Sequence, residues 1–178
     1  MGIMLDEKAD PTLFVNCIDT IKMDLTCGNE VKEALALSTL GNMAPASMAN
    51  ELAPAVIHKC LQENRSTPLY VRKKACMCLL ALLRRQKLIY KPDIWVEGMH
   101  SLLSSTNYGL LLSACSLLLT TIKMFGPEQY VGLTPQLVTI LSDMQKYAQD
   151  YYYYMTPCPW LQCKILQILQ IMPPPISD

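Results

Sequence analysis

The sequence predicts an all-α protein. Its apolar residues are mostly Leu, Ala, Ile and Met, all but Ile strong helix formers, and only 7 of 178 residues are glycine. Hydrophobic residues make up 51% of the chain and charged residues 17%, so the chain can bury a core and is not disordered. Proline and glycine divide it into about eight helical segments, whose pairs recur roughly every 40 residues. That period favours a HEAT- or armadillo-like α-α superhelix (solenoid) over the competing architecture, a compact helical bundle.

The first three helices are separated by clear stop and start signals. The first spans approximately 12–25 and is followed by Gly28, which suits a left-handed C-terminal cap. Asn29 begins the second helix, and Pro45 breaks it. A third helix is expected around 48–62.

The fourth helix has the clearest periodicity. Thr67 and Pro68 form the N-cap and first-turn proline that typically open a helix. Apolar residues then recur at helical spacing on one face, which we expect to be buried. These residues are Val71, Ala75, Cys78, Leu79 and Leu82.

Four more helices follow. Their expected starts are Pro92, Tyr108 or Gly109, Gly126-Pro127 and Pro159, and Pro173, Pro174 and Pro175 end the last one. The longest stretch without a charge, 98–122, contains a turn signal at 104–107. The apolar helix that remains has about 15 residues, too short to cross a bilayer, so we expect a central helix buried on two sides.

Eight cysteines would suggest disulfides in a secreted protein. Nearly all of them lie in apolar helical patterns, and residues 1–10 lack the apolar segment of a signal peptide. We therefore expect buried, reduced, cytosolic thiols. There is no Cys-x-x-Cys pair, and His58 and Cys60 would diverge on a helix, so no metal site is expected.

Charge is zero overall but unevenly distributed. Residues 1–64 carry a net charge of −5, residues 65–91 contain eight basic and no acidic side chains, and residues 92–178 carry −3. Basic side chains eleven residues apart share one side of a helix, about 16 Å from each other. This predicts a basic ridge that binds an acidic partner or, alternatively, a solvated face balanced by the acids of an adjacent repeat. The ridge consists of Arg72, Lys73, Lys74, Arg84 and Arg85.

Two classes of function are not expected. The basic segment is short and has no interleaved aromatic residues, which argues against nucleic acid. The chain contains no glycine-rich phosphate loop, no Gly-x-Ser-x-Gly or His-Glu-x-x-His motif and no Asp-x-Asp cluster. With two histidines it has little acid–base capacity, and core packing explains Cys76 better than a nucleophilic role does. We therefore predict a non-enzyme without a cofactor.

The most distinctive segment, 149–175, reads QDYYYYMTPCPWLQCKILQILQIMPPP. Its four consecutive tyrosines are expected to run as an extended connector, with alternate rings facing inward, that fixes the entry of the eighth helix. A ligand-stacking surface is the alternative. We expect Tyr153, Pro159 and Trp160 to be structural, with the Trp160 ring buried at a junction between repeats.

This segment resembles the trunk of alpha-adaptin, the large subunit of the plasma-membrane clathrin adaptor complex. In that family a tyrosine-rich stretch leads into Pro-x-Pro-Trp-Leu, then a Lys-x-Leu-x-x-Leu-Gln helix, then prolines. Stretch 71–79 is also similar to a pattern of Val, basic residues, Ala, Cys and Leu that all adaptin large subunits share. The residues in the alpha-type order are Tyr151, Tyr153, Tyr154, Pro157, Pro159, Trp160, Leu161, Lys164, Leu166, Leu169, Gln170, Pro173 and Pro174.

The resemblance implies a scaffold. Residues 1–178 would be an internal segment of the N-terminal trunk solenoid, with no second domain. Such a trunk cradles the sigma small subunit and, with the beta trunk, surrounds the mu medium subunit. The complex links cargo and phosphoinositide-rich membrane to clathrin at plasma-membrane coated pits, which implies a cytoplasmic, peripheral-membrane protein. The family's best-known phosphoinositide contact is not carried over to the basic ridge.

Two other classes of protein stay open on the residues alone. One is a generic HEAT or armadillo interaction module of the coatomer or transport-receptor type. The other is a phosphoinositide-binding peripheral protein that acts alone, for which the basic ridge would supply the binding surface.

Overall fold

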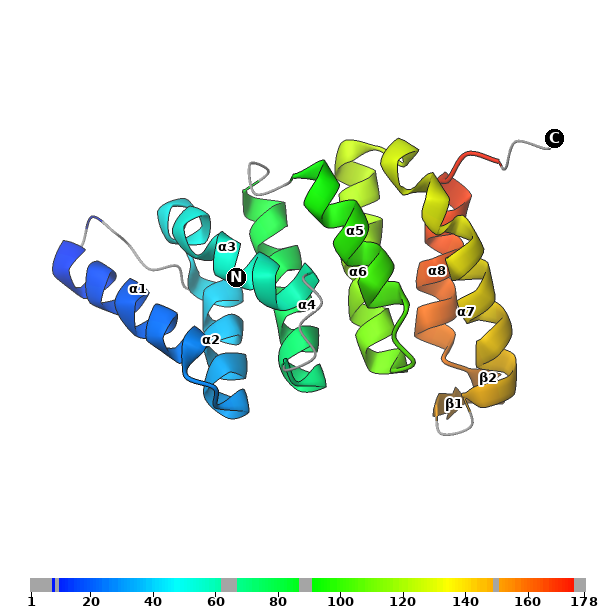
Figure 1. The fold of residues 1–178 in the computed structure, drawn as a ribbon, viewed down its shortest axis with the longest axis horizontal. Coiled ribbons are helices and arrows are strands. Elements are labelled where there is room, and N and C mark those ends of the chain that lie inside the picture. The colour runs from blue at the N-terminus through cyan, green and yellow to red at the C-terminus, as the bar shows by residue number, and fades with distance from the viewer. Residues whose placement is uncertain (1–7, 9, 62–66, 87–90, 149–150, 175–178) are drawn as a thin grey trace. The chain divides into compact units, whose positions relative to one another are not determined.

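The computed structural model describes residues 8, 10–61, 67–86, 91–148 and 151–174, and these residues are predominantly helical (Figure 1). They form eight α-helices, one 3-10 helix and one sheet of two very short strands. The prediction of an all-α fold with about eight helices is confirmed. The chain divides into two compact units, Met1–Lys91 (unit 1) and Pro92–Asp178 (unit 2).

The described part of unit 1 is built from four helices (Figure 1). Helix α4 packs against both α2 and α3, and α1 packs mainly against α2. The helices are α1 (Pro11–Thr26), α2 (Glu30–Met43), α3 (Ala46–Leu61) and α4 (Leu69–Arg85).

Local capping fixes the boundary between α1 and α2. Asn29 is the N-cap of α2, and its side-chain oxygen accepts hydrogen bonds from the N–H groups of Val31 and Lys32, both at 3.1 Å. Gly28 precedes it with a φ of +70°, a left-handed conformation that suits a residue without Cβ. Both predictions from the sequence are confirmed.

The apolar face predicted for α4 forms the core of unit 1. All five of its members are buried, the most exposed being Cys78 at 3%. Helix α2 approaches this face closely at Gly41, because a Cβ on Gly41 would lie 3.3 Å from the Cα of Cys78. The glycine therefore permits the close α2–α4 packing, and the predicted face is confirmed.

Helix α4 begins later than the sequence suggested. Its first residue is Leu69, and Pro68 is the N-cap residue, with no side-chain hydrogen bond to the helix. Pro68 has a ψ of 144°, which is not helical, so the helix cannot include it. The prediction that Thr67 caps a helix starting at Pro68 is wrong.

Unit 2 is organised around α6, which packs against both α5 and α8. Helix α7 contacts the 3-10 helix η2 and α8. The elements are α5 (Pro92–Leu103), α6 (Tyr108–Phe125), η2 (Glu128–Leu133), α7 (Thr134–Tyr147), β1 (Tyr152–Tyr153), β2 (Thr156–Pro157) and α8 (Pro159–Ile171). The predicted starts of α5, α6 and α8 are confirmed, whereas Pro175, in the proline stop, lies outside the described residues.

The seventh predicted helix starts at a different point. Gly126, with a φ of +97°, ends α6, and Pro127 leads into η2 and not into an α-helix. Helix α7 begins at Thr134, with a proline in its first turn. The predicted start at Gly126-Pro127 is wrong, because the Gly-Pro signal marks the end of one helix without fixing where the next begins.

Helix α6 has 18 residues, so the prediction of an apolar helix of about 15 residues, too short to cross a bilayer, is wrong. Half of the helix is nevertheless buried within the protein. Its packing against α5 and α8 accounts for the apolar surface. The hydroxyl groups of Ser113, Ser116 and Thr120 are satisfied within the helix, because each donates a hydrogen bond to the carbonyl oxygen four residues earlier, at 2.8–3.1 Å. We therefore interpret α6 as the central core helix of unit 2.

Candidate interaction surfaces

The five residues of the basic ridge all lie on α4, but their side chains have different environments. Arg84 is exposed, whereas Arg72 has buried guanidinium nitrogens. The guanidinium of Arg85 donates hydrogen bonds to the carbonyl oxygens of Ala44 (3.2 Å) and Asn42 (3.0 Å), at the C-terminal end of α2. Arg85 therefore ties two helices together.

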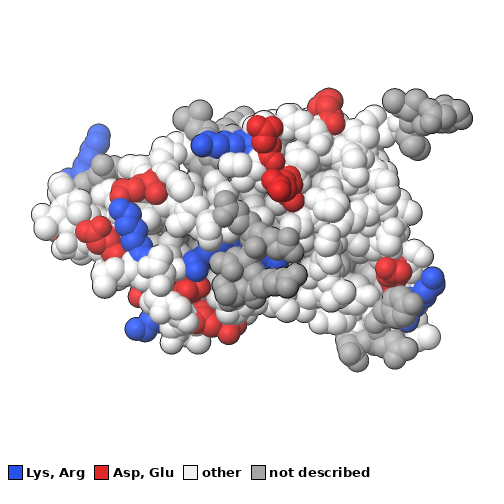
Figure 2. Space-filling view, in the orientation of Figure 1, with Lys and Arg blue, Asp and Glu red and all other residues white. Residues whose placement is uncertain are grey.

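Lys73 and Lys74 are half-buried, and the ammonium of Lys74 lies 5.7 Å from the centre of the Tyr70 ring. Over unit 1, in the view of Figure 2, the blue side chains form separate patches among red and white ones. Arg84 is thus the member of the ridge with the most freely available charge. Binding of an acidic partner by the ridge stays a prediction.

The tyrosine run is a hairpin. Tyr152 pairs with Pro157 and Tyr153 with Thr156, leaving Tyr154 and Met155 as a two-residue turn. Both turn residues have positive φ, 46° and 64°, as in the type I′ turns that match the twist of a hairpin. The rings do not alternate between inward and outward positions, since Tyr151, Tyr152, Tyr153 and Tyr154 are all at least 47% exposed. The prediction of an extended connector with alternating rings is wrong.

Trp160 is also at the surface. It follows Pro159 in the first turn of α8 and is 60% exposed, so the expected burial of its ring is wrong for this chain. Its ring centre lies 5.1 Å from that of Tyr153, whose ring in turn meets Tyr154 edge-on at 4.7 Å. Trp160, Tyr153 and Tyr154 form an exposed aromatic cluster, and the structural role of Tyr153, Pro159 and Trp160 stays a prediction.

A second apolar surface lies in unit 1. Helices α1 and α2 border a groove of about 400 Å³, whose lining includes Leu13, Ile21 and Leu35. Leu13 is 52% exposed and Leu35 is 65% exposed, and further large apolar side chains of these two helices face solvent. Exposed apolar side chains beside a groove make it a candidate surface for a partner or a neighbouring repeat. Sequence reasoning did not locate this groove, although it expected excess apolar surface.

All eight cysteines are free thiols, and five of them are buried: Cys60, Cys76, Cys78, Cys115 and Cys158. Burial raises the pKa of Cys78 and of Cys115 to about 12. Among the described residues, no three His, Cys, Asp or Glu side chains are grouped so that they could hold a metal ion. The thiols of Cys78 and Cys115 are therefore protonated packing groups near neutral pH.

These features define a class of protein. The described residues form an all-helical framework that displays apolar and aromatic surfaces, which is typical of proteins that hold partners. Comparison with known families specifies the class further: the model of the family described as "Adaptin N terminal region" matches residues 2–175. The chain belongs to this adaptin family. The family's domain is a helical solenoid, and the family is one of structural adaptors and not of enzymes.

Several large subunits of adaptor complexes are similar to the chain. It is 38% identical over 159 residues to the AP-2 complex subunit alpha-1 of Arabidopsis thaliana, covering 88% of this chain and 15% of the relative. It is 30% identical over 181 residues to the AP-2 complex subunit alpha-2 of Dictyostelium discoideum, covering 98% and 18%. The AP-1 complex subunit gamma of Dictyostelium discoideum is 30% identical over 178 residues, covering 96% and 18%. The chain thus spans less than a fifth of the length of these relatives.

Proposed function

We propose that the chain is one continuous segment of the trunk of an alpha-type large subunit, that it has no second domain, and that it acts as a scaffold in a clathrin adaptor complex. In this proposal it supports coat assembly and cargo selection in clathrin-mediated endocytosis. Its partners would be the sigma small, beta large and mu medium subunits, and through them clathrin and cargo. It would work in the cytoplasm at plasma-membrane coated pits, with peripheral contact to anionic membrane.

The observation that carries this proposal is the match to the adaptin N-terminal region across residues 2–175, which includes both units. Identity supports the alpha branch, since the Arabidopsis thaliana alpha subunits reach 38%. The alpha and gamma subunits of Dictyostelium discoideum are both 30% identical, so they do not discriminate. The alpha assignment therefore also depends on the Pro-x-Pro-Trp-Leu motif that ends at Leu161 and on the prolines after α8.

The exposed apolar surfaces support a holding role. The groove on α1 and α2 and the aromatic cluster would each be costly to leave in water in a protein that worked alone. Partners or neighbouring trunk repeats that cover them would stabilise the segment by burying apolar area. We therefore expect the isolated chain to self-associate and to become more soluble with a partner.

Co-expression tests the assignment. The chain is produced with the sigma subunit of an AP-2-type complex and, in parallel, with the sigma subunit of an AP-1-type complex. We expect co-purification with the AP-2-type partner and an increase in the soluble, monodisperse fraction. Preferential recovery of the AP-1-type sigma subunit would reassign the chain to the gamma branch. Recovery of coatomer subunits or importins in place of sigma and beta adaptins would overturn the scaffold proposal.

Liposome flotation separates the scaffold from a phosphoinositide-binding protein that acts alone. We expect no recruitment to phosphoinositide vesicles in the absence of adaptor partners. The informative variant is Arg84→Glu, because Arg84 is exposed, whereas a change at Arg85 would also remove hydrogen bonds to α2. Flotation of the wild-type chain alone, abolished by Arg84→Glu, would favour the stand-alone function.

A further inference from the structure

Unit 2 contains a pocket of about 430 Å³, separate from the surfaces described above. It lies among the C-terminal end of α5, the turn into α6 and the side of α7. Leu103, Leu111 and Ile140 supply its apolar surface, and hydroxyl, amide and carboxylate side chains supply the rest. This volume falls in the range of small-molecule and side-chain binding pockets.

The hydroxyl groups of two lining residues are committed as hydrogen-bond donors to the protein itself. The hydroxyl of Ser104 donates to the carbonyl oxygen of His100 at 2.9 Å, and that of Thr139 donates to the carbonyl oxygen of Pro135 at 3.0 Å. A hydroxyl whose hydrogen is committed can only accept further bonds. Both side chains are therefore acceptors toward any ligand.

The amide of Gln136 reinforces this polarity. Its Nε2 donates to the hydroxyl oxygen of Ser104 at 2.9 Å and to the carbonyl oxygen of His100 at 3.3 Å. Since a carbonyl oxygen can only accept, these contacts fix which end of the amide is nitrogen. The remaining atom, Oε1, is buried and has no hydrogen-bond partner. Both N–H bonds of the amide are thus directed at Ser104 and His100, so Gln136 offers no free donor to a ligand, and its buried Oε1 is not exposed to the pocket.

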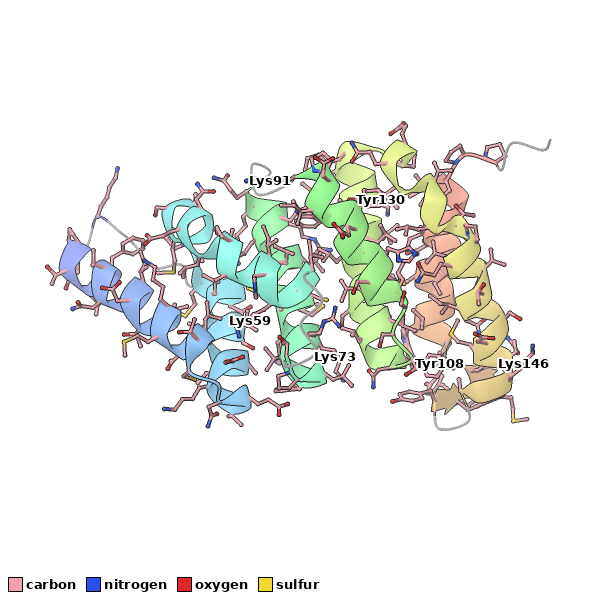
Figure 3. All side chains as sticks on the ribbon, viewed as in Figure 1. Lys59, Lys73, Lys91, Tyr108, Tyr130 and Lys146 are labelled. Carbon is pink, nitrogen blue, oxygen red and sulfur yellow. The ribbon has the colours of Figure 1, made fainter. Side chains whose placement is uncertain are left out.

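The pocket is also negatively charged. Asp143, on α7, is in its lining and forms no ion pair with any described residue. The described part of the lining contains no Lys, Arg or His. Tyr108 also lines the pocket. Burial, with smaller effects from Cys158 and Asp143, raises the pKa of its phenol, so the hydroxyl is neutral near pH 7. Tyr151 packs edge-on against Tyr108 at 5.5 Å, which links the pocket to the hairpin. Figure 3 labels Tyr108 at the end of unit 2 near this hairpin.

We propose that this pocket binds the arginine side chain of an extended peptide segment. The apolar stem of the arginine would lie on Leu111 and Ile140. The guanidinium, which has five N–H donors and no acceptor, matches the hydroxyl oxygens of Ser104 and Thr139 and the carboxylate of Asp143. The ring of Tyr108 adds a face on which a planar cation can stack. Within the described part of the chain the carboxylate of Asp143 has no ion-pair partner and the lining has no basic residue, which favours a cationic occupant over an anionic or purely apolar one.

The first experiment varies the ligand. Blocked pentapeptides of the form Gly-Gly-X-Gly-Gly, with X as arginine, citrulline, norleucine or glutamate, are titrated into the chain. Binding is followed by NMR of the 13C-labelled isoleucine methyl groups, with Ile140 as the reporter inside the pocket. We expect arginine to bind about tenfold more tightly than citrulline, which has the same shape without the charge, because a charge-assisted hydrogen bond is lost. Equal binding of citrulline or norleucine would overturn the proposal.

The second experiment varies the protein. Asp143→Asn keeps the shape of the side chain and should weaken binding of the arginine peptide by about tenfold, and it should also remove most of the salt dependence. The matched control is Asp93→Asn in the first turn of α5, an acid of the same unit outside the pocket lining, which should leave binding unchanged. Equal loss in both variants would show non-specific attraction, and undiminished binding by Asp143→Asn would also refute the proposal.

Discussion

Alanine substitutions at the two tryptophans of unit 2 should have very different costs. Trp95, on α5, is 0% exposed, and truncating a fully buried tryptophan typically costs about 3–5 kcal/mol. Trp160 is 60% exposed, which leaves about 40% of its surface covered. Scaling by that share gives about 1–2 kcal/mol for Trp160→Ala. The contact with the Tyr153 ring accounts for part of this, since an aromatic pair contributes about 0.5–1.5 kcal/mol.

Urea unfolding followed by far-UV circular dichroism measures both costs, because tryptophan fluorescence changes with the substitutions themselves. Trp95→Ala should shift the midpoint at least twice as far as Trp160→Ala. A double-mutant cycle with Tyr153→Ala isolates the ring–ring contact. Equal shifts for the two tryptophans would refute the reasoning. If that equality disappeared on dilution, self-association would be covering Trp160.

Three further outcomes follow from the packing. Gly41→Leu should destabilise unit 1 by about 1–3 kcal/mol in urea unfolding, because a leucine side chain at position 41 has no room against α4. An unchanged unfolding midpoint would show that α2 and α4 do not approach closely at Gly41. Gly28→Ala should cost about 1–2 kcal/mol because φ is +70°, with Gly28→Asn costing less, and equal costs would contradict the left-handed cap. Burial raises the pKa of Cys78 and Cys115 to about 12, against 9.0 when unfolded, so the unfolded chain loses these protons first. The free energy of unfolding should therefore fall between pH 9 and 12, and a flat pH profile would contradict this. Ellman's reagent at pH 8 should modify the exposed Cys163 long before the buried thiols, and modification of all thiols at the same rate would contradict their burial.

The helices could be predicted from the sequence because their signals are local. Gly28 and Asn29 act on the backbone within a few residues of themselves, and the apolar stripe of α4 repeats at the helical period. Gly126 marks only the end of α6, so the sequence did not locate the start of α7 at Thr134. The family resemblance was likewise readable from residue order, and the match over residues 2–175 confirmed it.

The candidate surfaces were less predictable. Arg85 looked like one member of a charged helix face, but its guanidinium reaches the end of α2, more than 40 residues earlier in the chain. The tyrosine run contains no glycine or asparagine to announce a turn, yet the pairing of β1 with β2 imposes positive φ on Tyr154 and Met155. The apolar groove on α1 and α2 and the pocket that contains Asp143 were missed because each is shared by more than one helix.

By itself the sequence determined the class of fold, most helix boundaries and the adaptin family, since these depend on spacing, capping and residue order along the chain. Only the tertiary structure decided which side chains keep their chemistry available. It left Trp160 and Arg84 exposed and used Arg85 to join two helices. It also placed Asp143 at a pocket, with no ion-pair partner among the described residues. The physical reason is that burial, hydrogen bonding and charge pairing depend on groups brought together from distant parts of the chain, which local sequence does not specify.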